Sequence, residues 1–182
     1  IQYQAPLLRR ISAEPDIDLK VFFGTDFSIR PFVAHDFGRT IEWDVPLVDG
    51  YRHEFLPVLG PHEEKDLGFW KPLNYGLARR LSEGGFDAIW IHGYARWLHW
   101  TAMAAARRRG IKVLLRDEAT PISALRGPVK RAAKRVFFAG LRHFVDAFLA
   151  IGSLNRRYYI EHGIPEERIF PVPYAVDNAR FR

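Results

Sequence analysis

The chain has 182 residues, of which 48% are hydrophobic, a size and composition typical of one folded domain. It contains no cysteine, which excludes disulfides, thiolate metal sites and cysteine nucleophiles and fits a reducing compartment. The formal net charge is +6, but residues 96–142 hold twelve Lys or Arg against two acids, a local charge of +10. Such a block attracts polyanions, unless it is only a solvated face that keeps the protein soluble.

No apolar run approaches the roughly 20 residues that a spanning helix needs, and no basic-then-apolar leader opens the sequence. We therefore expect neither a membrane span nor an export signal. The expected location is the cytoplasm, with peripheral contact to the inner face of a membrane left open.

The first half of the chain mixes helical and extended patterns. Leu7, Leu8 and Ile11 have helical spacing, and the apolar run at 19–23 ends at a glycine, as a buried strand does. The expected elements are a helix at 4–13, a strand at 19–23, an aromatic-rich loop at 25–42, a weaker strand at 51–56 and a helix at 72–83.

The second half alternates regularly between apolar strands and helices. The strands are expected at 87–91, 112–115 and 147–151, the helices at 97–109, 127–144 and 153–162, and a final extended segment at 169–176. This alternation is typical of βαβ units. It predicts an α/β fold with a Rossmann-like, doubly wound, mainly parallel sheet and helices on both faces.

Three strand ends carry polar groups or glycine: His92-Gly93, Arg116-Asp117-Glu118 and Gly152-Ser153. In sheets of this kind ligands bind beyond the carboxyl ends of the strands, so these residues should line one crevice. His92 is the candidate catalytic group, because imidazole exchanges protons near neutral pH, although a lone histidine often only hydrogen-bonds a loop. Gly93 would let a ligand approach the backbone.

The charged triplet has two interpretations. Arg116 can clamp a phosphate or carboxylate, and Asp117 and Glu118 can hold hydroxyl groups. The same three residues could equally form an internal salt bridge. Ser153 is first of all a helix N-cap, although its amides could bind an anion. The sequence has no nucleophile–base pattern, no metal-ligand spacing and no glycine-rich nucleotide loop, so no metal is expected.

The helix expected at 127–144 has separated faces. On a helical wheel its cationic side chains share one arc, which also contains Phe138, while Val129, Val136 and Phe144 lie on the opposite side, which should pack on the sheet. An exposed aromatic among cations indicates a peripheral membrane contact, although single surface phenylalanines are common. The predicted membrane-facing residues are Lys130, Arg131, Lys134, Arg135 and Phe138.

The C-terminal part resembles the end of the N-terminal domain of family 4 glycosyltransferases. The residues that carry this resemblance are 148–155, then Gly163-Ile164-Pro165-Glu166-Glu167-Arg168-Ile169, then Pro171-Val172-Pro173-Tyr174-Ala175-Val176-Asp177. Residues 2–7, 43–47 and 51–56 are similar to the first helix and variable middle of that family. The resemblance extends over essentially the whole chain.

The resemblance implies the N-terminal half of a GT-B fold, a single domain over residues 1–182 that ends at the hinge to a C-terminal domain. It implies a retaining glycosyltransferase in which this half binds a hydroxylated acceptor and the other half binds the nucleotide-diphosphate sugar, without a metal cofactor. The chain alone is then expected to be inactive, because catalysis requires donor and acceptor together.

One position departs from the family. Many members have a histidine after the strand at 112–115, where this chain has Arg116, whereas His92-Gly93 matches the family's frequent His-Gly. The competing hypothesis is a free-standing basic module that binds anionic membrane or another polyanion without catalysis. Nucleic acid is the weaker form of it, because no nucleic-acid-binding motif is present.

Overall fold

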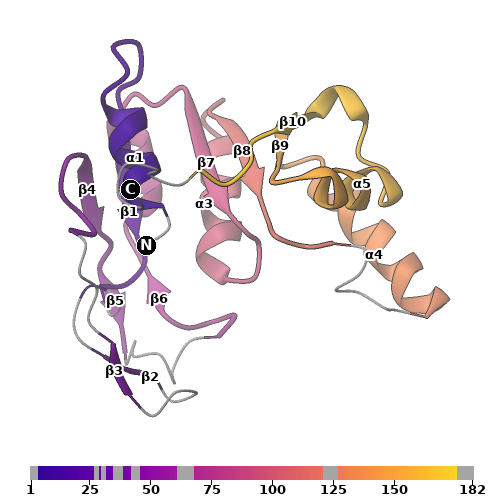
Figure 1. Ribbon diagram of the computed structural model, residues 1–182, viewed down its shortest axis with the longest axis horizontal. Coiled ribbons are helices and arrows are strands. Elements are labelled where there is room, and N and C mark those ends of the chain that lie inside the picture. Colours follow the sequence, from indigo (N-terminus) through magenta and orange to yellow (C-terminus); the bar gives the residue numbers. More distant parts are fainter. Residues whose placement is uncertain are drawn as a thin grey trace, which may run out of the picture. The chain divides into compact units, whose positions relative to one another are not determined.

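The computed structural model describes residues 4–26, 29, 32–34, 39–41, 46–60, 68–120 and 127–175 (Figure 1). The chain forms two compact units. Unit 1 consists of Ile1–Gly76 with Ala175–Arg182, and unit 2 consists of Leu77–Tyr174. The two units are described separately below.

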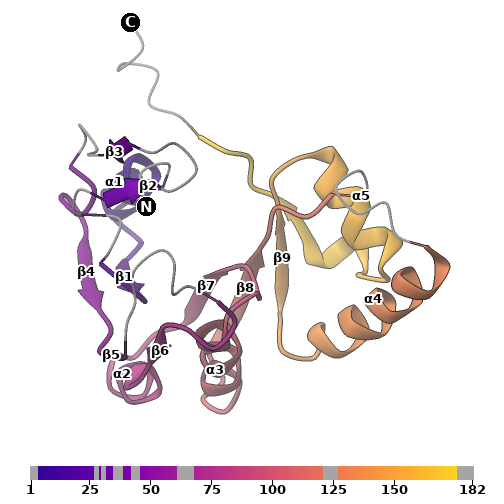
Figure 2. The same cartoon turned by 90° about the horizontal axis from the view of Figure 1, so that it is seen from below.

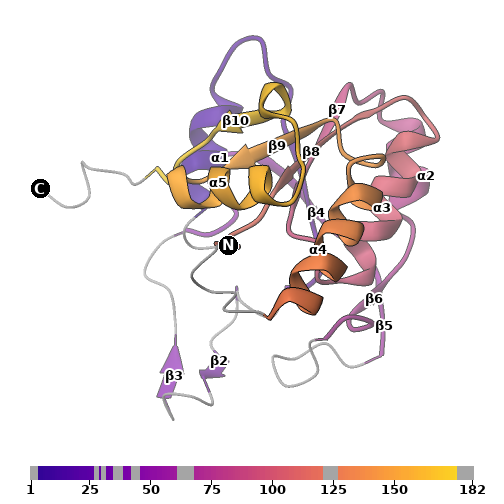
Figure 3. The same ribbon diagram turned by 90° about the vertical axis from the view of Figure 1, so that its right-hand side faces the viewer.

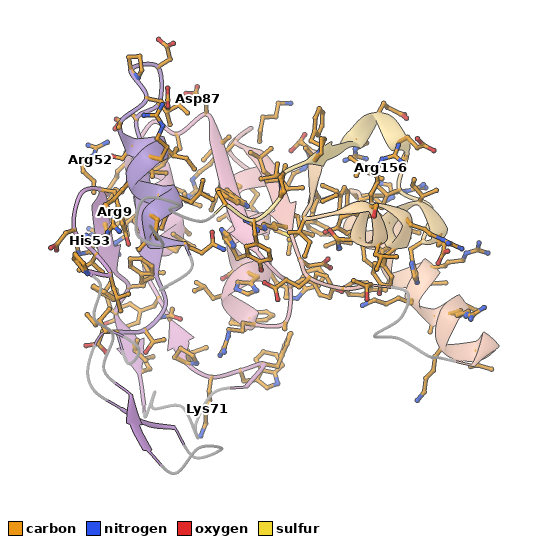
Figure 4. The ribbon with its side chains drawn as sticks, viewed as in Figure 1. Arg9, Arg52, His53, Lys71, Asp87 and Arg156 are labelled. Carbon is orange, nitrogen blue, oxygen red and sulfur yellow. The ribbon has the colours of Figure 1, made fainter. Side chains whose placement is uncertain are left out.

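Unit 1 is built around one helix and a parallel pair of strands. Helix α1 (Ala5–Ser12) precedes strand β1 (Lys20–Phe23), which pairs in parallel with β4 (Arg52–Phe55). Lys20 and Glu54 form an ion pair across the two strands at 2.7 Å. Helix and sheet meet in a core of Ala5, Leu8 and Tyr51 packed against Leu19, Val21 and Phe23. Arg9 on α1 and His53 on β4 can be located in Figure 4.

Two expectations for the first half of the chain were wrong in part. The loop expected at 25–42 contains two short antiparallel strands, β2 (Phe32–Ala34) and β3 (Arg39–Ile41). The helix expected at 72–83 begins only at Leu77, because its first residues form β6 (Leu73–Asn74), which pairs with β5 (Val58–Leu59). Gly76, with φ +80°, then turns the chain in a conformation that favours glycine.

Unit 2 contains a four-stranded parallel sheet. Its strands are β7 (Ala88–His92), β8 (Lys112–Arg116), β9 (Ala147–Ala150) and β10 (Ile169–Pro171), and each lies beside the next in the chain. A parallel sheet flanked by helices confirms the predicted α/β, Rossmann-like fold class. Of the extended segment expected at 169–176, the last residue lies outside the described residues.

The helices of unit 2 lie beside the strands that they connect. Helix α3 (Trp97–Arg107) packs on β7 and β8, and α2 (Leu77–Glu83) packs on α3 (Figure 2). Helix α5 (Ser153–Glu161) packs on β9 and β10 (Figure 3). The largest fully buried side chains of this unit are Met103, Val113, Leu115, Phe138, Leu141, Val145, Phe148, Asn155 and Tyr159.

Helix α4 (Pro128–Leu141) is oriented differently from the sequence-based expectation. Phe138 was predicted on the exposed cationic face, but it is fully buried, with its ring 5.7 Å from that of Tyr158 and 6.4 Å from that of Phe148. Val129 and Val136 were expected to pack on the sheet, but they are 80% and 74% exposed. The buried side carries Phe138 and Leu141, with Phe137 half-buried beside them, and these larger side chains bury more apolar surface than two valines among alanines would.

Because of this orientation, one cationic side chain of α4 points inward and three others are exposed. Lys134 points inward, where its Nζ donates to the Tyr94 hydroxyl at 3.0 Å and lies 4.4 Å from the centroid of the Phe137 ring. Its place on an outward membrane-facing surface was therefore wrong. Lys130, Arg131 and Arg135 are exposed, as expected, and the Arg135 Nε also donates to the Glu161 carbonyl at 3.1 Å.

Candidate functional site at the carboxyl ends of β7 and β8

The strand ends singled out in the sequence are neighbours in the sheet. His92, the last residue of β7, is the register partner of Arg116, the last residue of β8. The Gly93 amide donates to the Arg116 carbonyl at 2.6 Å, which ties the two strand ends together. Gly93 has φ +83°, so a side chain at this position would be strained. Backbone pairing therefore places His92, Gly93 and Arg116 together, as predicted.

The Arg116 side chain is buried, with 2% of its surface exposed, and it has no ion pair among the described residues. Its Nη1 and Nη2 atoms are shielded from solvent and lack hydrogen-bond partners in this part of the chain. The guanidinium carbon lies 4.3 Å from the ring centroid of Tyr174 and 5.8 Å from that of Trp90. Burial lowers the pKa of Arg116 below its usual value, although nearby Glu118 opposes this effect. The internal salt bridge that remained an alternative is not formed.

Asp117 makes no ion pair with Arg116 and belongs to a buried polar network, although its Oδ2 has no hydrogen-bond partner among the described residues. Its Oδ1 accepts hydrogen bonds from the Tyr159 hydroxyl at 2.9 Å and from the Asn155 Nδ2 at 3.1 Å. Asn155 also donates to the Ala119 carbonyl at 2.7 Å and accepts from the Ile151 amide at 3.1 Å. Burial and the neighbouring carboxylate raise the pKa of Tyr159, so its hydroxyl stays protonated. This network holds the segment after β8 against the start of α5.

Glu118 is exposed, and it accepts a hydrogen bond from the hydroxyl of Tyr174. Tyr174 lies in the extended segment that follows β10, 56 residues further along the chain. Of the two acids predicted to bind hydroxyl groups, Glu118 thus lies at the surface near Arg116, whereas Asp117 has a structural role.

His92 lies next to Arg116, and His99 lies near Gly93. The His92 ring stacks on Trp90, with centroids 4.6 Å apart. The pKa of His92 is lowered from 6.5 to about 4, first by desolvation and then by the charge of Arg116 and by His99. The pKa of His99 is also lowered to about 4, by burial and then by Arg96. At neutral pH both imidazoles are uncharged and can donate and accept one hydrogen bond each.

At the third strand end, after β9, the N-cap of α5 differs from the expectation. Helix α5 begins at Ser153, so its N-cap is Gly152, and no side chain caps the helix. Ser153 was therefore wrongly predicted as the cap. Instead, Asn155 binds the Ile151 amide one turn into the helix.

Other features of unit 2 lie away from these residues. A pocket of about 610 Å³ runs along α3 and is lined by Trp97, Trp100, Ala104, Arg108 and Phe144, but by none of the strand-end residues. Within the described residues, no group of three or more His, Cys, Asp or Glu side chains could hold a metal ion. In the same residues no helix is long and apolar enough to cross a bilayer.

Several residues of the site escaped the sequence analysis. Tyr159 and Asn155 lie on one side of α5, four residues apart, which a helical pattern marks only as buried. Tyr174 reaches Arg116 through a long-range contact that no local pattern predicts. Trp90 is different, because side chains two apart on a strand share one face, so its contact with His92 follows from the sequence.

Comparison with known proteins identifies the family of the chain. No curated protein and no solved structure matched the chain. A family model, described as glycosyl transferase 4-like domain, matches residues 31–175, which is most of the chain and includes every residue of the site. The protein therefore belongs to the glycosyl transferase 4-like domain family, which makes it a glycosyltransferase family member with a Rossmann-like α/β fold.

Proposed function

We propose that this chain is the acceptor-binding domain of a retaining glycosyltransferase. In this proposal the acceptor binds at the carboxyl ends of β7 and β8, and a second domain of GT-B type supplies the nucleotide-diphosphate sugar. The observation that supports it best is the pairing of His92 with Arg116 at one edge of the sheet. Ligands of open parallel sheets bind at that edge.

The chemistry of these residues suits a hydroxyl acceptor. With its pKa at about 4, His92 is neutral at pH 7, so one ring nitrogen can accept a hydrogen bond from the reacting hydroxyl. Gly93 has no side chain to obstruct the approach. The proposal requires no metal ion.

The division of labour between the domains can be tested by binding. The 182-residue chain should bind uridine diphosphate glucose, a representative donor, only weakly, and it should not transfer the sugar. The natural full-length protein should bind the donor and transfer it. Calorimetric titration of both proteins is the measurement. Tight donor binding or sugar transfer by the 182-residue chain would contradict the proposal.

Helix α4 supports a second proposal, which is peripheral attachment to an anionic membrane at the inner face. Its exposed surface has an apolar strip bordered by cations. The strip consists of Val129, Ala132, Ala133, Val136, Ala139 and Gly140, and the bordering cations are Arg131, Arg135 and Arg142. An apolar strip with basic residues at its side is the composition of interfacial helices.

Sedimentation with vesicles tests this attachment. The chain should pellet with vesicles that contain phosphatidylserine and remain in solution with neutral vesicles. Val136→Asp should reduce pelleting, because it places a charge in the apolar strip. Arg156→Gln on α5 is the control for net charge, since it changes the charge by the same amount and Arg156 lies on a different helix (Figure 4). Equal losses in both variants would mean that net charge alone, and not this helix, drives binding.

A further inference from the structure

Arg116 carries a positive charge that no described group neutralises by direct contact. Its two terminal nitrogens are buried, and neither has a hydrogen-bond partner among the described residues. Buried charges in proteins are normally paired or hydrogen-bonded, since an isolated ion loses its hydration without compensation. Arginine cannot escape this cost by releasing its proton. Among the described residues, Arg116 therefore has no counter-ion in direct contact.

The nearest carboxylates do not fill this position. Asp117 directs its Oδ1 to Tyr159, Asn155 and the Ala119 amide. Glu118 remains at the surface with its Oε1 bound to the Tyr174 hydroxyl. Glu118 is close enough to raise the pKa of Arg116, but it makes no ion pair with it. An incoming anion would compete with Glu118 for proximity to Arg116, and Glu118 is free to turn into solvent.

Two aromatic rings lie against the Arg116 guanidinium. Tyr174 lies 4.3 Å from its carbon, and Trp90 lies at 5.8 Å. Rings that contact the face of a guanidinium hold its plane and leave the N–H groups at its edge available to two oxygens. Tyr174 itself is 46% exposed, and its contact with Glu118 is one hydrogen bond between surface groups. An entering ligand can therefore displace the Tyr174 ring from Arg116.

We infer that Arg116 binds a phosphoryl group carried by the acceptor, and that the Tyr174–Glu118 hydrogen bond is a latch that opens when this group enters. The inference rests on the proposed function, because it names the class of acceptor. Two N–H groups of the guanidinium match two phosphoryl oxygens. The local charge of +10 over residues 96–142 favours a dianion, and the neutral His92 adds no charge beside Arg116.

Three probes separate the sources of such a group. Glycerol 3-phosphate represents a phosphorylated acceptor, glycerol is its neutral counterpart, and uridine diphosphate represents the donor. The readouts are the Gly93 amide and the Arg116 Nε–H signals in nitrogen–proton NMR spectra of the 182-residue chain. Glycerol 3-phosphate should shift both signals at lower concentration than glycerol or uridine diphosphate does.

Variants locate the binding. Arg116→Met should weaken glycerol 3-phosphate binding by roughly tenfold or more, because it removes two charge-assisted hydrogen bonds. Arg131→Met, an exposed cation on α4, is the matched control and should change binding by less than about twofold. Tyr174→Phe opens the latch but keeps the ring, and Glu118→Gln removes the competing charge. Both should tighten binding.

Each outcome decides a separate point. Equal losses in Arg116→Met and Arg131→Met would overturn the inference, since binding would then belong to the whole basic region. If glycerol and glycerol 3-phosphate shift Gly93 equally, the acceptor site stands but the phosphoryl inference fails. If uridine diphosphate binds best and depends on Arg116, the phosphoryl group belongs to the donor, and both the inference and the proposed function fail. If no probe shifts Gly93 or Arg116, the phosphoryl inference fails.

Discussion

His92 and Arg116 lie side by side at the ends of β7 and β8, although a whole helix separates them in the sequence. The Gly93 amide fixes their spacing through its 2.6 Å hydrogen bond to the Arg116 carbonyl. A neutral imidazole thus lies next to a buried guanidinium that has no counter-ion within the part of the chain that the structure describes. The consequences of this arrangement differ for stability, for pH dependence and for activity.

Replacing Arg116 should cost little or no stability. Arg116→Met keeps most of the side-chain volume and removes an uncompensated buried charge, so the melting temperature should stay the same or rise. Lys134→Met is the comparison, because Lys134 binds the Tyr94 hydroxyl and contacts three aromatic rings. Its loss should cost about 1–2 kcal/mol. Calorimetric unfolding measures both. A fall of several degrees for Arg116→Met would mean that Arg116 supports the fold.

The network below the site should contribute strongly to stability. Asn155→Ala removes the side-chain partner of the Ala119 carbonyl and of the Ile151 amide and one of the hydrogen bonds that Asp117 accepts, and it should cost about 1–3 kcal/mol. Arg156→Ala, the next residue on α5, breaks only the exposed ion pair with Glu166 and should cost less than about 1 kcal/mol. Urea unfolding of the two variants makes the comparison. Equal losses would show that the buried hydrogen bonds add nothing.

Stability should fall as the pH drops from about 6.5 towards 4. The folded pKa values of His92 and His99 are about 4, below the 6.5 of the unfolded chain, so the unfolded chain binds more protons in this range. The contribution is fully present above pH 6.5 and is lost as both imidazoles become protonated. His99 should dominate, because its Nδ1 is shielded from solvent whereas the His92 residue is exposed, so that solvent weakens the effect of its surroundings. His99→Gln should therefore flatten the curve of unfolding free energy against pH more than His92→Gln does. An unchanged curve in His99→Gln would contradict the lowered pKa.

The orientation of α4 can be tested by two substitutions on opposite faces. Phe138→Ala should destabilise the protein by roughly 3–5 kcal/mol, because the ring is fully buried against Tyr158 and Phe148. Val136→Ala should change stability by less than about 0.5 kcal/mol, since Val136 is exposed. Thermal unfolding of both variants is sufficient. The reverse order would restore the helix orientation predicted from the sequence.

The parallel sheet and the meeting of His92 with Arg116 could be predicted from the sequence. Apolar strands alternate clearly with helices in residues 87–171, and consecutive parallel strands bring their ends to one edge. The orientation of α4 could not be predicted, because both of its faces contain apolar side chains. Only the tertiary contacts of Phe138 with α5 and β9 decide which face is buried.

Contacts between residues far apart in the sequence could not be predicted either. The pairing of Glu118 with Tyr174 and that of Asp117 with Tyr159 join residues 56 and 42 positions apart. The sequence therefore left the choice between a salt bridge and a ligand-binding arginine open. The start of α2 was missed for a local reason, because the glycine turn at Gly76 separates a strand pair from the helix.

Sugar transfer by the natural full-length protein tests most directly whether the ends of β7 and β8 form the acceptor site. His92→Gln and Arg116→Met should each reduce the transfer rate roughly tenfold or more while the protein remains folded, because the proposed function places both groups against the acceptor. Arg156→Ala, exposed on α5, should transfer at the unaltered rate and serves as the control. If His92→Gln and Arg116→Met transfer sugar as fast as the unaltered protein does, the acceptor does not bind at these strand ends.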